Sequence, residues 1–212
     1  MDFRPFGRFA RLRAVLAALV VIAALTGCGR DVPRVPPLGA DAIVLAFGDS
    51  LTYGTGASAA DSYPAALERL IGRKVATAGV PGEVSAQGLA RLPGVLEQVQ
   101  PQLLILCHGG NDLLRKLDPG ALARNLREMV GLARARGIAV VLIAVPQPGL
   151  LPSAHPVYAE VATELALPVE TGALTEILTD NALKSDPIHP NAQGYARLAE
   201  RVADLLRKAK AI

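Results

Sequence analysis

The chain has 212 residues, of which 51% are hydrophobic, and this is enough for one domain with a sizeable core. Its formal net charge of +3 arises in residues 1–27, which hold four of the 22 basic and one of the 19 acidic residues, so that 18 of each remain. A chain that is neutral beyond this point exerts no long-range attraction on nucleic acid, which argues against a nucleic-acid partner. With only two cysteines, Cys28 and Cys107, the chain has no disulfide framework.

The N-terminal segment has the features of a secretory signal peptide. Four arginines (Arg4, Arg8, Arg11 and Arg13) precede an unbroken apolar run over 14–25, which is shorter than the roughly 18 residues that a membrane span needs. We therefore predict a signal peptide over 1–27. The stretch Leu25-Thr26-Gly27-Cys28 resembles the lipobox of bacterial lipoproteins. This resemblance implies that Cys28 is lipidated and anchors an exported protein to a bacterial cell membrane, with the domain in the periplasm or at the cell surface. The alternative is an ordinary leader that happens to contain a cysteine.

The next segment is rich in proline and poor in large apolar residues. Residues 28–40 contain Pro33, Pro36 and Pro37, and this composition predicts an extended tether. The remainder, residues 41–212, has neither an internal repeat nor a composition shift that would mark a second domain. We therefore predict a single domain over 41–212.

Short apolar runs alternate with helical patterns along this domain. Such alternation predicts a parallel sheet with helices on both faces. The five runs cover residues 43–47, 75–78, 103–107, 138–145 and, more weakly, 167–169.

Two helices have clear signals. Asp118 followed by Pro119 predicts a helix start, and the helix is expected to end before Gly137. The last helix is predicted to begin near Asn191 and to pack one apolar face on the sheet. That face comprises Tyr195, Leu198, Ala199, Val202, Leu205 and Leu206.

The first apolar run ends abruptly at Gly48-Asp49-Ser50. Ligands of open α/β sheets bind beyond the carboxyl ends of such strands, so this pattern places Ser50 at the edge where a site is expected. Taken alone, the same residues could be only a strand-to-helix turn, because Gly, Asp and Ser favour turns and helix caps.

A second stretch, Asp186-Pro187-Ile188-His189, favours the catalytic interpretation of Ser50. A serine hydroxyl needs a base to accept its proton, and a carboxylate that holds the other ring nitrogen makes a histidine an effective base. Asp186 and His189 supply that pair just before the last helix. The third run also ends in a polar turn, at Gly109-Gly110-Asn111-Asp112.

These blocks resemble the GDSL family of serine hydrolases, also called SGNH hydrolases. The resemblance rests on residues 48–51, Gly82 in Val80-Pro81-Gly82-Glu83, residues 109–112 and the Asp186/His189 pair, in family order. It implies a three-layer α/β/α fold with a flavodoxin-like five-stranded parallel sheet. It also implies that Ser50 is the nucleophile, His189 the base and Asp186 the group that orients His189. The oxyanion would bind to the backbone amides of Ser50 and Gly82 and to the side chain of Asn111, without metal or cofactor.

The implied activity is hydrolysis of acyl esters or thioesters through an acyl-enzyme. The segment Gln87-Gly88-Leu89-Ala90-Arg91-Leu92-Pro93 is similar to the arylesterase, thioesterase and lysophospholipase branch of the family. We expect a monomer that acts on a small acyl ester or thioester. A carbohydrate O-acetyl esterase of the same family stays open. Two alternatives lie outside enzymes. A flavodoxin-like binding protein does not require Asn111, Asp186 and His189 together, and a lipid-tethered protein that has lost catalysis would usually lack a triad member, whereas none is missing here.

The sequence leaves two interpretations open for His108 and two for residues 146–158. His108 could shape the pocket, or it could be a strand-end histidine bonded to a backbone group; like His155, it belongs to no recognisable metal-ligand spacing. Residues 146–158, which include Leu150 and Leu151, could line an acyl pocket or form core beneath a loop. Asp49 and Asp112 are interpreted as turn and supporting residues, not as acids in the reaction.

Overall fold

The computed structural model of the chain describes residues 32–149 and 153–212. The predicted signal peptide, Cys28, Leu150 and Leu151 lie outside the described residues. No helix within the described part is long and apolar enough to cross a membrane.

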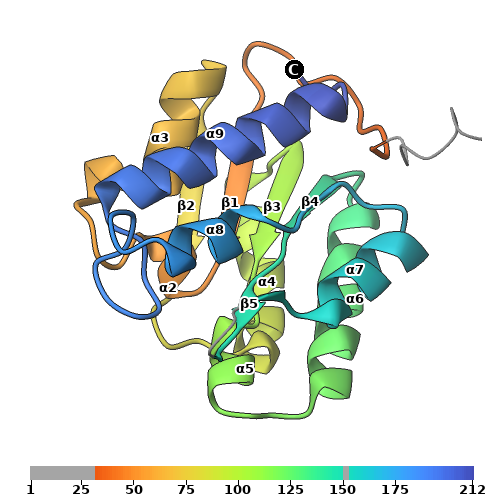
Figure 1. Ribbon diagram of the computed structural model, residues 1–212. Helices are drawn as coiled ribbons and strands as arrows, with labels where there is room; N and C mark the ends of the chain where they lie inside the picture. Colours follow the sequence, from red (N-terminus) through yellow and green to blue (C-terminus); the bar gives the residue numbers. More distant parts are fainter. Residues whose placement is uncertain (1–31, 150–152) are drawn as a thin grey trace, which may run out of the picture. The chain divides into compact units, whose positions relative to one another are not determined.

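Five parallel strands form the central sheet, in the order β2-β1-β3-β4-β7 (Figure 1). Their bounds are β1 (Val44–Gly48), β2 (Val75–Gly79), β3 (Leu103–Cys107), β4 (Ala139–Ile143) and β7 (Val169–Glu170). This is the predicted flavodoxin-like arrangement, and all five predicted strands are present. β4 is shorter than the apolar run over 138–145, and Ala144 and Val145 beyond its end are also buried. The amide of Ala144 still donates to the carbonyl of Glu170 in β7 at 2.8 Å, so the contact between the two strands continues past the end of β4.

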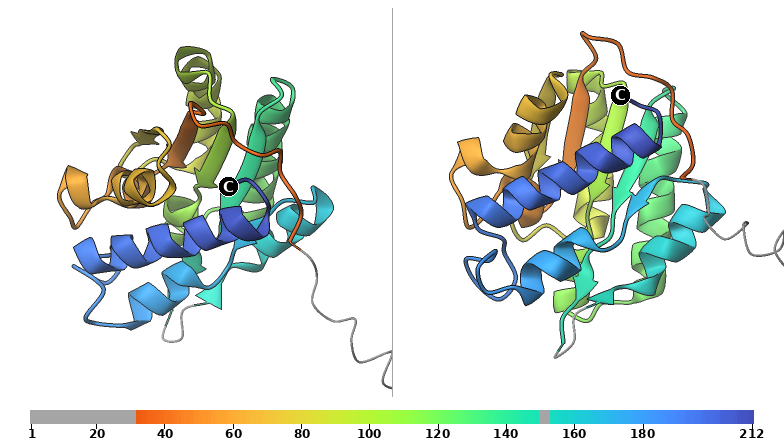
Figure 2. Two further views of the ribbon diagram at one scale, coloured as in Figure 1. Left: turned by 90° about the horizontal axis from the view of Figure 1, so that it is seen from above. Right: turned by 45° about the horizontal axis from the view of Figure 1, so that its top comes forward.

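Helices cover both faces of the sheet and complete three layers (Figures 1 and 2). On one face, α3 (Tyr63–Ile71) packs against α9 (Ala192–Lys208), and α8 (Ala173–Thr179) lies beside α9. On the other face, α4 (Ser85–Val99) packs against α6 (Pro119–Arg134), and α7 (Pro156–Glu164) lies beside α6. The short elements are α2 (Ser50–Tyr53), η1 (Ala59–Asp61), α5 (Gly110–Leu114) and a two-stranded hairpin of β5 (Pro146–Gln147) and β6 (Ser153–Ala154).

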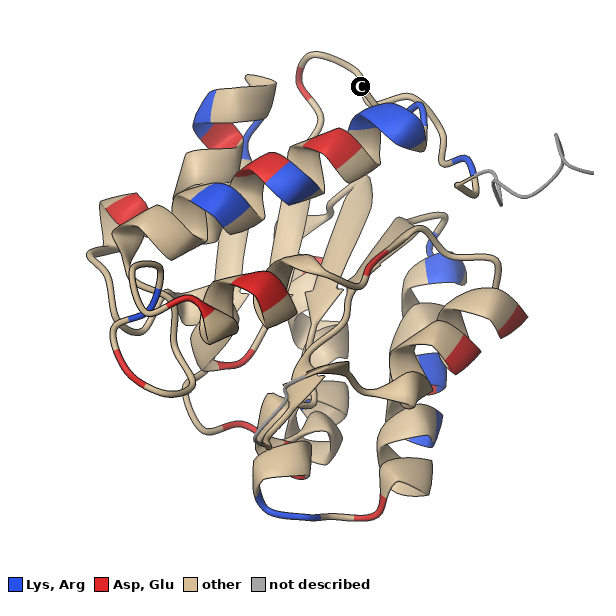
Figure 3. Cartoon of the chain, in the orientation of Figure 1, with Lys and Arg blue, Asp and Glu red and all other residues tan. Residues whose placement is uncertain are grey.

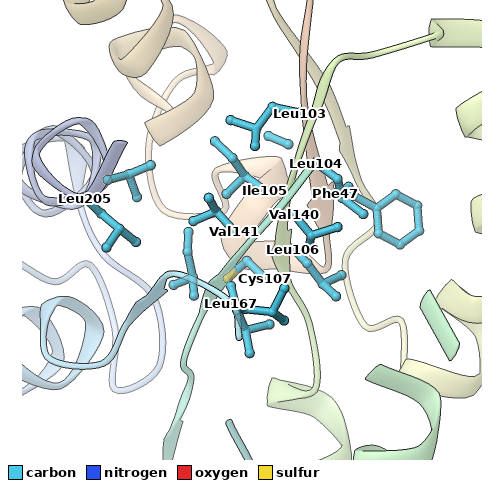
Figure 4. Close-up of a cluster of buried hydrophobic side chains, with 14 of the residues drawn as sticks. Phe47, Leu103, Leu104, Ile105, Leu106, Cys107, Val140, Val141, Leu167 and Leu205 are labelled. Atoms are coloured by element: carbon cyan, nitrogen blue, oxygen red, sulfur yellow. The ribbon is translucent and has the colours of Figure 1, made fainter. Parts of the chain in front are cut away.

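The core follows from strands that are apolar on both faces. Figure 4 shows Ile105 and Val141 on the side of α9, near Leu205, whereas Phe47, Leu106 and Val140 leave the opposite face. Each fully buried side chain of this kind stabilises the fold by about 1.5–3 kcal/mol relative to an exposed one. β1 to β4 carry no charged residue, and the charges lie on helices, loops and the edge strand (Figure 3).

The predicted helix starts are confirmed by their caps. The Asp118 carboxylate accepts hydrogen bonds from the backbone amides of Gly120 and Ala121, at 2.9 and 3.0 Å. The Asn191 side chain accepts one from Gly194 at 3.0 Å. The six apolar positions predicted for the last helix are all buried.

The prediction that residues 32–40 are a tether outside the domain is wrong. The compact unit begins at Val32, and the side chains of Val35 and Leu38 are only 8% exposed. Their amides donate to the carbonyls of Ala209 and Ala211 beyond the end of α9, at 3.0 and 2.8 Å. Proline-rich composition predicts extended backbone, but it does not tell whether apolar residues between the prolines find a surface to cover.

The end of β2 packs directly against α2, and this contact gives a stability test. A Cβ added at Gly79 would overlap the backbone of Tyr53, whereas one added at Gly131 on α6 would meet nothing within 4 Å. We expect Gly79→Ala to lower the free energy of unfolding by about 1–3 kcal/mol, as overpacking does. Gly131→Ala should leave it unchanged or raise it by up to about 1 kcal/mol. Urea denaturation of both variants checks this, and equal effects would contradict the proposed contact.

Candidate active site

Ser50 stands where β1 passes into α2. The strand ends at Gly48, and the carboxylate of Asp49 caps the helix by accepting a hydrogen bond from the Leu51 amide at 3.0 Å. A Cβ at Gly48 would overlap the Cys107 carbonyl of the neighbouring strand, so glycine permits the close approach that the turn requires. Ser50 is therefore the first helical residue and is partly exposed.

Ser50, His189 and Asp186 form one chain of hydrogen bonds. His189 Nε2 lies 3.0 Å from Ser50 Oγ, and His189 Nδ1 lies 2.7 Å from Asp186 Oδ2. Because a carboxylate only accepts, the proton of the neutral ring sits on Nδ1, and Nε2 is left to accept the Ser50 proton. The sequence separation between Ser50 and His189 is 139 residues, yet the fold brings them into contact.

The carboxylate of Asp186 is held from both sides. Its Oδ1 accepts from the backbone amides of Ile188 and His189, both at 2.8 Å. Slight burial raises the pKa of Asp186, but hydrogen bonds from His189 and Ile188 outweigh it, so the pKa lies below its ordinary value. Asp186 is therefore ionised near neutral pH and fixes the orientation of the His189 ring.

Asn111 lines the same cleft as Ser50 and His189. Its Nδ2 donates to the main-chain carbonyl of Glu83 at 3.0 Å and makes a longer contact of 3.4 Å with Asp49 Oδ2. Gly82 lies one residue before Glu83, in the loop after β2, and adopts a left-handed backbone with φ of +79°. Its carbonyl accepts from Arg115 at 2.8 Å. Of the five predicted residues, Ser50, Asn111 and His189 line the cleft. Asp186 joins them through its hydrogen bond to His189, and Gly82 does not line the cleft.

The aspartates beside the blocks have supporting positions. Asp49 is 1% exposed, and burial raises its pKa above the ordinary value. Asp112 accepts from the amide and hydroxyl of Ser85 at 2.8 and 2.6 Å, which fixes the start of α4. These contacts agree with the interpretation of both as turn and supporting residues.

A buried ionic cluster lies behind Asn111, and sequence reasoning gave it no role. The carboxylate of Glu83 accepts from Arg91 Nε and Nη2 at 2.8 and 2.7 Å and contacts His108 Nε2 at 3.1 Å. The only sequence signal was the position of Glu83 beside Gly82, and of Arg91 in the stretch over 87–93. His108 is fully buried, and its Nδ1 accepts from the Gly109 amide at 3.0 Å. Of the two interpretations of His108, the one with a bond to a backbone group is confirmed.

A cleft of about 220 Å³ opens at Ser50. Its polar lining comes from Asp49, Ser50, Asn111, Gln147 and His189, and its other walls are largely apolar. The apolar walls include Leu51, Leu114, Val145, Pro146, Leu178 and Ile188. Residues 146–149 thus line the cleft, as one interpretation of this loop expected. His155 instead caps α7 by accepting from the Val157 amide at 3.3 Å.

A family comparison identifies the fold and its chemistry. Residues 46–197 match the model of the GDSL-like Lipase/Acylhydrolase family. The chain belongs to this family. As a GDSL-like protein it is a serine hydrolase that acts on ester bonds, as the sequence blocks predicted.

Curated relatives and solved structures agree with this assignment. The chain is 30% identical over 178 residues to Esterase TesA of Pseudomonas aeruginosa, covering 77% of this chain and 87% of that protein. It is 31% identical over 172 residues to Thioesterase 1/protease 1/lysophospholipase L1 of Escherichia coli K12, covering 77% and 83%. A crystal structure of TesA superposes with a TM-score of 0.71 at 29% identity, covering 79% of this chain and 99% of that one. The SGNH-hydrolase family esterase AlinE4 gives 0.63 at 31% identity, covering 81% and 98%.

The state of Glu83 gives this GDSL-like chain an acid-sensitive contribution to stability. Burial raises the pKa of Glu83, but hydrogen bonds from Arg91 and His108 outweigh it and lower the pKa from 4.5 to about 2. Because the folded pKa is the lower one, the stabilisation is complete above about pH 4.5 and is lost as the pH falls towards 2. As the pH falls from about 4.5 to 2, the free energy of unfolding of the parent should therefore fall towards that of Glu83→Gln. Urea titrations at several pH values measure it; a difference that stays constant down to pH 2 would contradict the ionised pair.

Proposed function

We propose that the chain hydrolyses carboxylic esters or thioesters of acyl groups through a Ser50-His189-Asp186 triad and an acyl-enzyme. The observation that carries the proposal is the hydrogen-bonded chain from Ser50 Oγ to Asp186, placed at the mouth of a largely apolar cleft. A nucleophile, a base within hydrogen-bond reach and a group that orients the base are what acyl transfer requires.

The reaction has two stages, acylation of Ser50 and hydrolysis of the acyl-enzyme, and His189 acts as base and then as acid in each. Ser50 Oγ bonds to the acyl carbon while His189 Nε2 takes its proton, and Asp186 stabilises the imidazolium that forms. The tetrahedral adduct then collapses, and the leaving alcohol or thiol takes the proton from His189. Water attacks the Ser50 ester with His189 again as base, which releases the carboxylic acid and restores Ser50.

The developing oxyanion needs donors that are in place before the reaction. We assign this role to the Ser50 and Gly82 amides and to Asn111 Nδ2. Asn111 shares the cleft with Ser50, and Gly82 lies in the loop whose next residue binds the Asn111 side chain. The proposed side-chain donor thus follows β3 and the proposed loop donor follows β2, on the two sides of β1, which Ser50 follows.

The walls of the cleft favour an apolar acyl group over a bare acetyl group on a carbohydrate. Leucine, isoleucine, valine and proline side chains from α2, α5, α8 and the loops before β5 and α9 surround the polar groups. Burying an acyl chain there contributes about 0.8 kcal/mol per CH₂, which acetyl cannot provide. Related proteins named thioesterase, lysophospholipase and arylesterase support a broad choice of leaving group.

We also propose that the enzyme is exported and held at a membrane by a lipid on Cys28. The support is the order of features over 1–28, namely arginines, a short apolar run and a lipobox-like Leu25-Thr26-Gly27-Cys28. A lipid anchor requires no membrane-spanning helix in the catalytic domain.

The triad is tested by trapping the nucleophile. We expect a fluorophosphonate to add one adduct to the parent protein, with loss of hydrolysis of acyl esters, acyl thioesters and acetylated sugars alike. Ser50→Ala should take up no adduct, whereas Ser58→Ala, which changes an exposed serine eight residues away, should react like the parent. An adduct that survives Ser50→Ala would overturn the assignment. Within the same screen, hydrolysis of acetylated sugars alone would favour the O-acetyl esterase.

Asn111 is tested by separating catalysis from binding. If its side chain donates to the oxyanion, Asn111→Ala should lower kcat about 10²- to 10³-fold. KM should change much less, because the interaction strengthens in the transition state. The thermal midpoint of the same preparation serves as control, and near-normal kcat in a well-folded variant would remove Asn111 from the site.

The anchor is tested by the mature N-terminus. We expect mass spectrometry of the processed protein to begin at Cys28 with added lipid mass, and Cys28→Ala to lose the lipid and leave the membrane fraction. A mature N-terminus elsewhere, without lipid, would make the leader an ordinary signal peptide.

A further inference from the structure

We infer that Glu83 is a positioning residue for catalysis: its carboxylate, clamped by Arg91 and His108, fixes the main-chain carbonyl that orients the Asn111 amide in the cleft. The inference rests on the proposed role of Asn111 as an oxyanion donor. It assigns a catalytic consequence to an ion pair that lies outside the cleft and touches neither Ser50 nor His189.

The Glu83 carbonyl decides which way the Asn111 side chain points. A carbonyl oxygen can accept from Nδ2 of an asparagine but is repelled by its Oδ1, so the 3.0 Å bond selects one of the two amide orientations. Nδ2 carries two hydrogens. The partner of the second is Asp49 Oδ2 at 3.4 Å, beyond the usual length of such a bond. That second hydrogen is therefore the one that can turn to an oxyanion without loss of a strong bond.

The position of this carbonyl depends on the Glu83 side chain. Arg91 holds the carboxylate with two parallel hydrogen bonds, an arrangement that fixes both distance and angle. The same guanidinium contacts the carbonyls of Ala78 and Gly48 at 3.2 and 3.4 Å and lies 4.2 Å from the centre of the Phe47 ring. Arg91 thus ties the Glu83 loop to the ends of β1 and β2, from which Ser50 and Gly82 follow.

His108 ties the same carboxylate to the end of β3. Because Nδ1 of His108 accepts from the Gly109 amide, the proton of the neutral ring is on Nε2, which donates to Glu83 Oε2. A Cβ at Gly88 would overlap the buried ring, so the ring is closely packed. The segment over 108–111 is therefore joined to Glu83 twice: His108 bonds to the Glu83 carboxylate, and Asn111 bonds to the Glu83 main-chain carbonyl.

A purely structural role would have different consequences from a positioning role. If the cluster only holds the loop together, Glu83→Gln should lower the thermal midpoint and leave kcat of the folded enzyme unchanged. If Glu83 acts through Asn111, its loss should lower kcat with little change in KM, and this loss should vanish once Asn111 is alanine.

The test is a double-mutant cycle on ester hydrolysis by the otherwise unchanged chain. We expect Glu83→Gln to lower kcat about tenfold, as a modest misplacement of a catalytic group does. Glu83→Gln with Asn111→Ala should have the kcat of Asn111→Ala alone, within about twofold. Arg91→Lys keeps the cation but not the two parallel bonds, and it should repeat this pattern singly and with Asn111→Ala. If Glu83→Gln does not fold, Arg91→Lys provides the same test.

The matched control is Arg127→Lys. Arg127 binds Glu160 and Glu164 through Nε and Nη2, the two nitrogens with which Arg91 binds Glu83. This ion pair lies between α6 and α7, away from the cleft, so the kcat of Arg127→Lys should match that of the parent. Two results would overturn this inference but leave the proposed function intact. One is a double variant in which the losses of kcat of the two single variants multiply; the other is a folded Glu83→Gln or Arg91→Lys with the kcat of the parent. A parent without Ser50-dependent hydrolysis would overturn the proposed function and this inference with it.

Discussion

The parallel register of β1, β2 and β3 is the constraint on which the site depends. Gly48 is paired with both Gly79 and Cys107, so the three strands end in one row. The chain then needs only a short connection from each strand to place a polar group at the same edge. Ser50 follows β1, Gly82 and Glu83 follow β2, and Asn111 follows β3. Small residues at the strand ends allow the backbone of α2 to lie against β2 without separating the strands.

Several polar side chains are buried at the same place, beyond the carboxyl ends of the strands. Asp49, Glu83, His108 and Asp112 are all buried near the strand ends, and each has hydrogen-bond partners. A buried polar group without partners would cost about 1–3 kcal/mol, so these bonds must form together for the edge to be stable. Within the described residues, Thr175 Oγ1 is the one buried side-chain nitrogen or oxygen without a partner, and it lies on α8. The polar edge is therefore a connected network that leaves its members few alternative positions.

Sequence predicted those parts of the structure that local patterns determine. The strands were visible because they are apolar on both faces, and Asp186 and His189 because a carboxylate three residues before a histidine can bond to its ring locally. The pairing of Glu83 with Arg91 and His108 was not visible, because it joins a loop, a helix and a strand end whose contact exists only after the sheet has formed. The tether was predicted wrongly for a related reason: proline content describes the backbone of residues 32–40, whereas burial of Val35 and Leu38 depends on the surface offered by the end of α9.

The packing of Val35 beside Ala209 fixes where the described chain enters the domain. α9 begins next to His189 and, with 17 residues, extends about 26 Å before it reaches the contact with Val35. His189 and Ile188, just before the start of α9, line the cleft, so the contact of Val35 and the cleft lie near opposite ends of this helix. The described chain therefore enters the domain at the end of α9 that is remote from Ser50 and His189.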